Sequence, residues 1–205
     1  MSEGRSLADL GLTARGAEAR IRILGITADS RAVRPGTLFA ALPGTRFHGA
    51  EFIEPALRMG ASAVLTDRAG AARAEQALAE YPGAALVVAE DARAALAMAA
   101  ALFFGAQPAT MVAVTGTNGK TSVASFARQI WAAMGETAIN IGTTGVEGAW
   151  EAPLSHTTPD SVTLHRVLAD AAGAGVTHAA MEASSHGLDQ RRLDGVRLAA
   201  AGFTT

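Results

Sequence analysis

The chain has 205 residues, of which 49% are hydrophobic and 18% are charged, a balance that supplies a folded core and excludes an intrinsically disordered protein. It contains no cysteine, which excludes disulfide frameworks, thiolate metal sites and cysteine nucleophiles. Seventeen basic and nineteen acidic residues give a formal net charge of −2, without the basic surface that a nucleic-acid-binding protein needs.

Short apolar runs alternate along the chain with longer amphipathic segments. The apolar runs predict strands at 37–42, 63–66, 85–89, 111–115, 177–183 and 197–204. The amphipathic segments predict helices at 50–59, 70–80, 91–104, 120–134 and 161–172. Strands that alternate with helices of about 10 or more residues indicate an α/β fold with mainly parallel sheets.

The amino-terminal region and the apolar runs bear on targeting. Residues 1–16 lack the apolar segment of a signal peptide. The longest apolar run, 94–104, is shorter than the roughly 18 residues of a membrane helix. We therefore expect a soluble, cytoplasmic protein with no membrane partner.

The segment Gly105–Thr110 separates two domains in this prediction, because it follows a long helix and carries both glycine and proline. The predicted domains are 1–107, a small α/β domain, and 108–205, a second α/β domain. The last predicted strand is followed by no helix. The pattern leaves open whether this strand is the edge of a finished sheet or the start of a longer domain.

A phosphate-binding loop is the strongest local signal. An apolar strand leads into a Gly-x-x-Gly-Lys-Thr segment, and a helix follows; Val114 occupies the position of the first glycine of the usual pattern. Lys120 is the only lysine beside sixteen arginines. A glycine-containing strand-to-helix turn is the structural alternative, but the position of this lysine favours ATP binding by the loop. The predicted ATP-binding residues are Gly116, Thr117, Asn118, Gly119, Lys120, Thr121 and Ser122.

Three stretches in order carry a resemblance to the Mur ligase superfamily: 26–53 (ITADSRAVRPGTLFAALPGTRFHGAEFI), the loop GTNGKTS, and 181–196 (MEASSHGLDQRRLDGV) together with HTTPDS at 156–161. The resemblance covers roughly 21–205. It implies an amino-terminal uridine-nucleotide domain, followed by the first part of a central ATP-binding domain. The relatives continue with a carbamylated lysine and a further domain, so the resemblance implies an amino-terminal fragment that is itself inactive.

The activity implied by the resemblance is ATP-dependent amide ligation in peptidoglycan synthesis. The relatives that act at the third step add a diamino acid to UDP-MurNAc-L-Ala-D-Glu through an acyl phosphate. We expect meso-diaminopimelate rather than L-lysine as the diamino acid, ATP as a substrate, Mg²⁺ as the cofactor and a monomeric protein.

Substrate-binding residues follow from the same resemblance. Those expected on the uridine nucleotide are Ala28, Ser30, Thr45, Arg46 and Phe47. Without the resemblance, Asp29-Ser30-Arg31 is a turn or capping tripeptide. Those expected on the muramoyl-peptide are Thr157, Thr158, Ser184, Gln190 and Arg192.

Two catalytic residues are predicted, Lys120 for phosphate charge and Glu182 for metal binding. Glu182 ends a buried strand, where open α/β sheets place ligands, and Mg²⁺ held by Glu182 and Thr121 would give this carboxylate a partner. A capped surface glutamate is the structural alternative.

Three other functions have less support in the sequence. The Ser184-Ser185-His186 run lacks the nucleophile elbow of a hydrolase. A switch or transport ATPase would need a Walker-B aspartate, and the corresponding strand ends in Glu182. A module that binds nucleotides without catalysis stays open.

Overall fold

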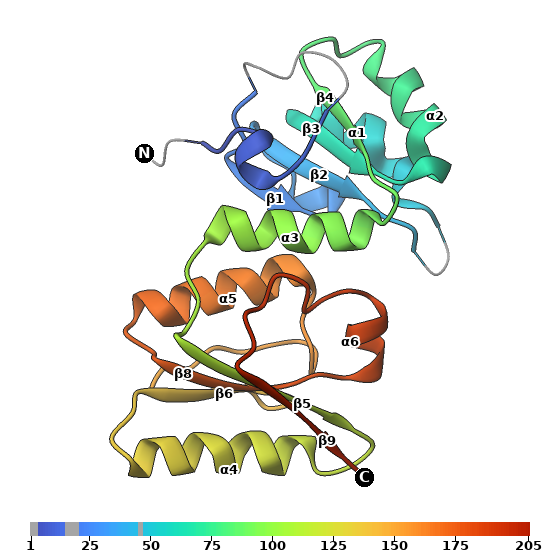
Figure 1. Cartoon of the computed structure of the whole chain (residues 1–205). Coiled ribbons are helices and arrows are strands. Elements are labelled where there is room, and N and C mark those ends of the chain that lie inside the picture. Colours follow the sequence, from blue (N-terminus) through green and yellow to red (C-terminus); the bar gives the residue numbers. More distant parts are fainter. Residues whose placement is uncertain (1–3, 15–20, 45–46) are drawn as a thin grey trace. The chain divides into compact units, whose positions relative to one another are not determined.

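The computed structural model describes residues 4–14, 21–44 and 47–205 (Figure 1). The chain divides into two compact units, one up to Phe103 and one from Phe104 to Thr205. In the described part of the chain, no helix combines the length and the apolar character needed to cross a membrane.

The first unit is built on a four-stranded sheet in which every pair of neighbouring strands is parallel. Its strands follow one another in chain order: β1 (Gly25–Thr27), β2 (Thr37–Ala41), β3 (Ala61–Thr66) and β4 (Ala85–Val88). Its helices are η1 (Ala8–Leu10), η3 (Ser30–Ala32), η4 (Gly49–Phe52), α1 (Ile53–Arg58), α2 (Arg68–Leu78) and α3 (Ala92–Phe104). Phe39, Ile53 and Val64 are buried between the sheet and α1 and α2.

The second unit contains a five-stranded sheet in the order β7-β6-β8-β5-β9, in which only the β6–β7 pair is antiparallel. Its strands are β5 (Thr110–Gly116), β6 (Ala138–Gly142), β7 (Gly145–Gly148), β8 (His178–Glu182) and β9 (Ala200–Thr204). Its helices are α4 (Lys120–Ala133), α5 (Ser161–Gly173) and α6 (Ser185–Asp189). Helix α4 covers one face of the sheet and α5 the other (Figure 1).

The predicted α/β class with mainly parallel sheets is confirmed. The prediction of one helix over 50–59 is wrong in detail, because a 3-10 turn, η4, precedes a short α1. Strands β1, β6 and β7 and helix α6 were not predicted. Strand β1 has three residues, too few for a periodic pattern, and β7 begins and ends with a glycine at positive φ.

His165 on α5 is a buried imidazole that makes one hydrogen bond. It is 1% exposed, and its Nε2 lies 2.9 Å from the carbonyl oxygen of Asp194, so Nε2 carries the proton. Its Nδ1 has no hydrogen-bond partner among the described residues. Burial lowers the pKa of His165 below its usual value of 6.5, the backbone hydrogen bond opposing this shift. The folded protein therefore keeps the imidazole neutral where the unfolded chain binds a proton.

Because His165 is buried in its neutral form, we expect the second unit to lose stability in acid. Below the unfolded pKa of 6.5, the unfolded state binds more protons, so the free energy of unfolding falls with decreasing pH, by at most about 1.4 kcal/mol per pH unit. Urea unfolding followed by tryptophan fluorescence would report this unit, since Trp131 and Trp150 both lie in it. In His165→Gln, the part of the pH dependence of the free energy of unfolding that comes from this histidine should disappear. An unchanged slope in the variant would contradict the assignment.

Candidate functional site

In the first unit, the predicted uridine-nucleotide residues gather at one edge of the sheet. Ala28 and Ser30 follow β1, and Phe47 follows β2. Because β1 and β2 are parallel neighbours, both segments lie at the carboxyl edge, where open α/β sheets bind ligands. The side chain of Phe47 is 62% exposed. Thr45 and Arg46 lie outside the described residues.

The tripeptide after β1 contains both a helix cap and a candidate ligand-binding hydroxyl. Asp29 caps η3 by accepting a hydrogen bond from Arg31 N at 3.0 Å, and it pairs with the Arg31 guanidinium at 2.8 Å. These hydrogen bonds lower the Asp29 pKa. The Ser30 hydroxyl has no side-chain hydrogen bond within the described ranges. Asp29 and Arg31 therefore account for the local structure, which leaves the Ser30 hydroxyl available to a ligand.

In the second unit, the predicted phosphate loop joins β5 to α4. Strand β5 ends at Gly116 and α4 begins at Lys120. The backbone N–H groups of the first helical turn have no partner within the helix, and they point toward the loop. Gly119 has φ +82°, a left-handed conformation that suits glycine at this turn. Lys120 Nζ donates hydrogen bonds to Gly116 O at 2.7 Å and to Thr117 O at 3.3 Å. The only ammonium side chain of the protein is thus held over the loop.

The end of β9 forms the other side of this loop. Thr204 Oγ1 lies 3.1 Å from Thr115 O and 2.6 Å from Asn118 O, so its one proton is shared between two carbonyl oxygens, and Asn118 N donates to Thr205 O at 3.2 Å. Gly116 has φ +133°, and a Cβ atom there would lie 2.0 Å from Thr204 O. Only glycine allows this close approach of the two strands.

Glu182 is a buried carboxylate at the carboxyl end of β8. It is 2% exposed, and its Oε1 accepts a hydrogen bond from Thr143 N at 2.9 Å. It makes no ion pair with any residue that the structure describes. Burying an ionised carboxylate without a counter-charge is costly, so a divalent cation fits this environment. Strand β8 pairs with β5, which places Glu182 opposite Val114, close to the start of the phosphate loop.

Two residues that hydrogen-bond to Glu182, Thr143 and Thr158, line a cavity of about 360 Å³. Four of the residues that line it were predicted to bind the muramoyl-peptide: Thr157, Thr158, Ser184 and Arg192. The other four were not predicted to bind substrate: Thr143, Ser155, His156 and His186. Thr158 holds its wall in place, because Thr158 Oγ1 donates to Glu182 O at 3.0 Å and accepts from Ser184 N at 2.9 Å. Thr158, which is expected on the muramoyl-peptide, thus hydrogen-bonds directly to Glu182, which is expected to bind the metal ion.

Three predicted substrate residues also have structural roles that the sequence did not indicate. Ser184 caps α6 by accepting a hydrogen bond from Gly187 N at 3.1 Å. Gln190 does not line the cavity, and its Oε1 accepts from Arg192 Nη2 at 2.8 Å. Arg192 Nη1 donates to Thr158 O at 2.6 Å. Gln190 therefore holds the guanidinium that borders the cavity.

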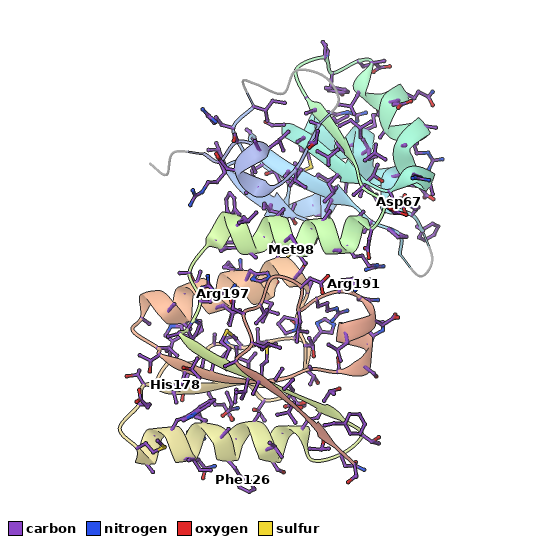
Figure 2. The ribbon with its side chains drawn as sticks, viewed as in Figure 1. Asp67, Met98, Phe126, His178, Arg191 and Arg197 are labelled. Carbon is purple, nitrogen blue, oxygen red and sulfur yellow. The ribbon has the colours of Figure 1, made fainter. Side chains whose placement is uncertain are left out.

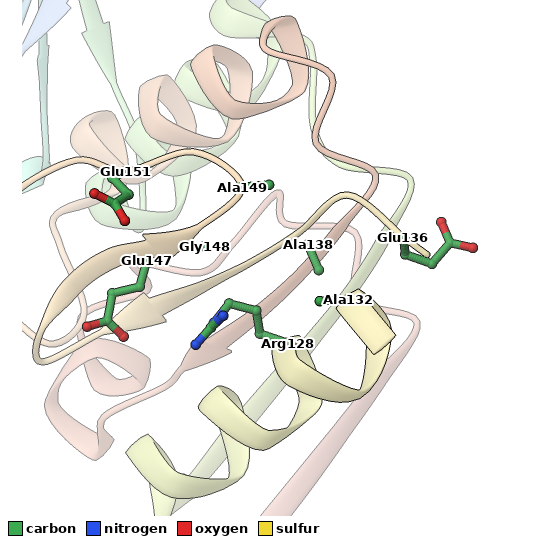
Figure 3. A pocket seen from close by; sticks show the side chains of 8 residues that line it. All are labelled: Arg128, Ala132, Glu136, Ala138, Glu147, Gly148, Ala149 and Glu151. Atoms are coloured by element: carbon green, nitrogen blue, oxygen red, sulfur yellow. The ribbon is translucent and has the colours of Figure 1, made fainter. Parts of the chain in front are cut away.

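A second hollow, of about 540 Å³, lies at the opposite edge of the same sheet (Figure 3). It is found where α4 ends and β6 begins, whereas Lys120 begins α4 and Thr143 follows β6. Arg128 Nε donates to the buried Asn140 at 2.6 Å, and Asn140 donates in turn to Glu147 at 3.1 Å. None of the predicted site residues lines this hollow.

Two histidines outside the candidate site, His48 and His178, have structural neighbours. His48 Nε2 lies 3.0 Å from Asp67 Oδ1, and its Nδ1 accepts a hydrogen bond at the start of η4. His178, at the start of β8 (Figure 2), packs its ring 5.1 Å from that of Trp131. Among the described residues, no three histidine and carboxylate side chains cluster as metal ligands.

Two domain families match this chain. Residues 22–104 match "Mur ligase family, catalytic domain", and residues 114–205 match "Mur ligase middle domain". The chain belongs to the Mur ligase family.

Three similar Mur ligases share one name. The chain is 55% identical over 202 residues to the UDP-N-acetylmuramoyl-L-alanyl-D-glutamate–2,6-diaminopimelate ligase of Rhizobium meliloti, covering 98% of the chain and 40% of that protein. It is 57% identical over 192 residues to the ligase of that name from Brucella melitensis, covering 93% of the chain and 38% of that protein. A solved structure with this name has a TM-score of 0.79 at 29% identity, covering 98% of the chain and 40% of that structure. The chain therefore spans about 40% of the length of these relatives.

The resemblance to Mur ligases is confirmed, while the individual site residues stay predictions. Thr143 is one of the four cavity residues that were not predicted to bind substrate. It lies in the turn Gly142-Thr143-Thr144-Gly145 between two strands that were not predicted. The pair of glycines marks such a turn, but its contact with Glu182 spans 39 residues of sequence and shows no local pattern.

Proposed function

We propose that this chain carries the uridine-nucleotide and ATP sites of a Mur ligase that joins 2,6-diaminopimelate to UDP-MurNAc-L-Ala-D-Glu. The observation that carries the proposal is the juxtaposition at one edge of the second sheet. There the phosphate loop, the buried Glu182 and the cavity that contains Thr157 and Arg192 follow neighbouring strands. The names of the 55–57% identical relatives support the choice of substrates.

The proposed reaction has two steps. The side-chain carboxylate of the D-glutamyl residue attacks the γ-phosphorus of ATP, giving an acyl phosphate and ADP. An amine of the diamino acid then attacks the acyl carbon, and inorganic phosphate leaves as the amide forms. In such transfers, the protein acts mainly by positioning and by stabilising charge.

Residues of this chain would supply part of that stabilisation. The backbone N–H groups of the loop and the Lys120 ammonium would hold the ATP phosphates. Thr121 and Glu182 would hold Mg²⁺, which, when bound, neutralises phosphate charge. Arg192 and Thr157 would hold the peptide part of the substrate at the cavity. ATP and uridine nucleotides are cytoplasmic solutes, so we place the protein in the cytoplasm, and we expect a monomer.

Calorimetric titrations would test this function. The 205-residue chain should bind UDP-MurNAc-L-Ala-D-Glu and, separately, ADP in the presence of Mg²⁺. A general phosphate-loop ATPase would bind ADP but would not bind the muramoyl nucleotide. Binding of ADP alone would therefore refute the muramoyl assignment, and binding of neither would refute both sites.

Ser30→Ala should weaken binding of the uridine nucleotide by about 1–2 kcal/mol, the loss of one hydrogen bond to a charged ligand. The melting temperature should barely change, because Asp29 and not Ser30 caps η3. Asp29→Ala is the matched control, and it should lower stability through the lost cap. A fall in the melting temperature of Ser30→Ala with intact affinity would show that Ser30 has only a structural role.

A further inference from the structure

The turn between β6 and β7 contacts both oxygens of the Glu182 carboxylate. Thr143 N donates to Oε1 at 2.9 Å, and Thr143 Oγ1 donates to Oε2 at 3.4 Å. A Cβ atom on the preceding Gly142 would lie 2.0 Å from Oε1, so the glycine allows the carboxylate to approach the turn. Two contacts from one residue fix both the position of the carboxylate and its rotation.

The same hydroxyl links Glu182 to the cavity. Thr143 Oγ1 lies 3.0 Å from Thr157 Oγ1, and both side chains line the cavity of about 360 Å³. A hydroxyl has one proton to donate, and a carboxylate can only accept. Thr143 therefore gives its proton to Glu182 and accepts one from Thr157. The order of donors runs from the cavity wall to the buried carboxylate.

We propose that Thr143 is a positioning residue, which orients the Glu182 carboxylate toward the metal ion of the bound Mg²⁺–nucleotide and couples that carboxylate to Thr157. This inference rests on the proposed function, since it takes Glu182 as a metal ligand. Groups that orient a metal ligand typically change metal affinity by about 10–100-fold when they are removed. Thr143 would act in this way without touching the nucleotide.

The experiment measures how much Mg²⁺ strengthens nucleotide binding. The ligand is adenylyl-imidodiphosphate, a non-hydrolysable ATP analogue, titrated into the 205-residue chain with EDTA and with Mg²⁺. The ratio of the two dissociation constants isolates the metal contribution. In Thr143→Val, this ratio should fall by about tenfold, while the affinity measured in EDTA stays unchanged, because the phosphate loop is intact. Thr143→Ser keeps the hydroxyl and should stay within about twofold of the wild-type ratio.

The neighbouring residue provides a matched control. Thr144 lies in the same turn, is exposed, and makes no side-chain hydrogen bond within the described ranges. Thr144→Val introduces the same chemical change and should leave the Mg²⁺ ratio at its wild-type value. If the Mg²⁺ ratio falls as much in Thr144→Val as in Thr143→Val, the inference is overturned, because the effect then belongs to the turn as a whole.

The outcomes separate this inference from the proposed function. If Mg²⁺ does not strengthen binding to the wild type, or if Glu182→Gln keeps the full ratio, the proposed metal site fails. If Glu182→Gln loses the ratio and Thr143→Val keeps it, only the role of Thr143 is overturned. Should Thr143→Val not fold, Thr143→Ala removes the same hydroxyl with less steric change. Failure of both variants to fold would assign Thr143 a structural role and overturn the inference.

Discussion

Lys120→Ala should lower the affinity for ATP analogues at least about a hundredfold, and Lys120→Arg should lower it nearly as much. The alanine variant loses charge-assisted contacts to phosphate, each worth about 1.5–3 kcal/mol, and about 1.4 kcal/mol corresponds to a tenfold change in affinity. The arginine variant keeps the charge, but its planar guanidinium does not fit where Nζ lies 2.7 Å from Gly116 O. Calorimetry with adenylyl-imidodiphosphate and Mg²⁺ measures both effects.

Arg166→Ala is the matched control for charge. Arg166 is an exposed residue of α5 in the same unit, so its loss removes one positive charge away from the loop. Its affinity for the analogue should equal that of the wild type. Wild-type affinity in Lys120→Arg would contradict the phosphate-loop assignment. A parallel loss of stability in Lys120→Ala would show instead that the ammonium mainly holds Gly116 and Thr117.

Gly116→Ala should destabilise the second unit by about 3 kcal/mol and abolish nucleotide binding, because it combines backbone strain with overpacking. The new Cβ would lie 2.0 Å from Thr204 O, a backbone atom that cannot rotate away. The φ of +133° adds strain for any residue with a side chain. Relief would require β9 to separate from the end of β5, which would distort the loop. Urea unfolding followed by tryptophan fluorescence reports this unit selectively.

Gly202→Ala tests whether the effect is specific to this position. Gly202 lies in β9 and pairs with Val114, but a Cβ atom there would meet no atom within 4 Å. This substitution should therefore leave both stability and nucleotide affinity close to wild type. Equal losses in the two variants would mean that β9 tolerates no side chain at either position, and the close approach at Gly116 would not be the cause.

The sequence predicts those parts of the fold that have a local periodic signal. Strand β5, the phosphate loop and α4 are contiguous, so their apolar pattern and glycines were sufficient. Strand β6 escaped detection because Asn140, which is 2% exposed, is an unusual residue for a central strand. Its amide is satisfied by Arg128 and Glu147, which belong to other elements. Such compensation depends on tertiary contacts and leaves no trace in local composition.

The same limit applies to the candidate site. Glu182 was predicted because it ends a buried strand, and Thr157 and Arg192 because of the family resemblance. The sequence suggested a metal ion as the partner of the Glu182 carboxylate, whereas the structure adds a hydrogen bond from Thr143 N. Hydrogen bonds such as those from Arg192 to Gln190 and from Thr158 to Glu182 fix the positions of the site residues. They depend on side-chain geometry, which pattern and spacing do not specify.

The hydrogen bonds between β9 and the phosphate loop make residue 205 a reporter position. Thr205 O accepts from Asn118 N, and Thr204 Oγ1 donates to Asn118 O. A fluorophore or spin label attached at Thr205 would therefore be carried by a residue whose backbone is hydrogen-bonded to the proposed phosphate loop. The chain has no cysteine, so Thr205→Cys would create a single thiol for such a label. Its signal would follow occupancy of the nucleotide site without any change to the loop itself.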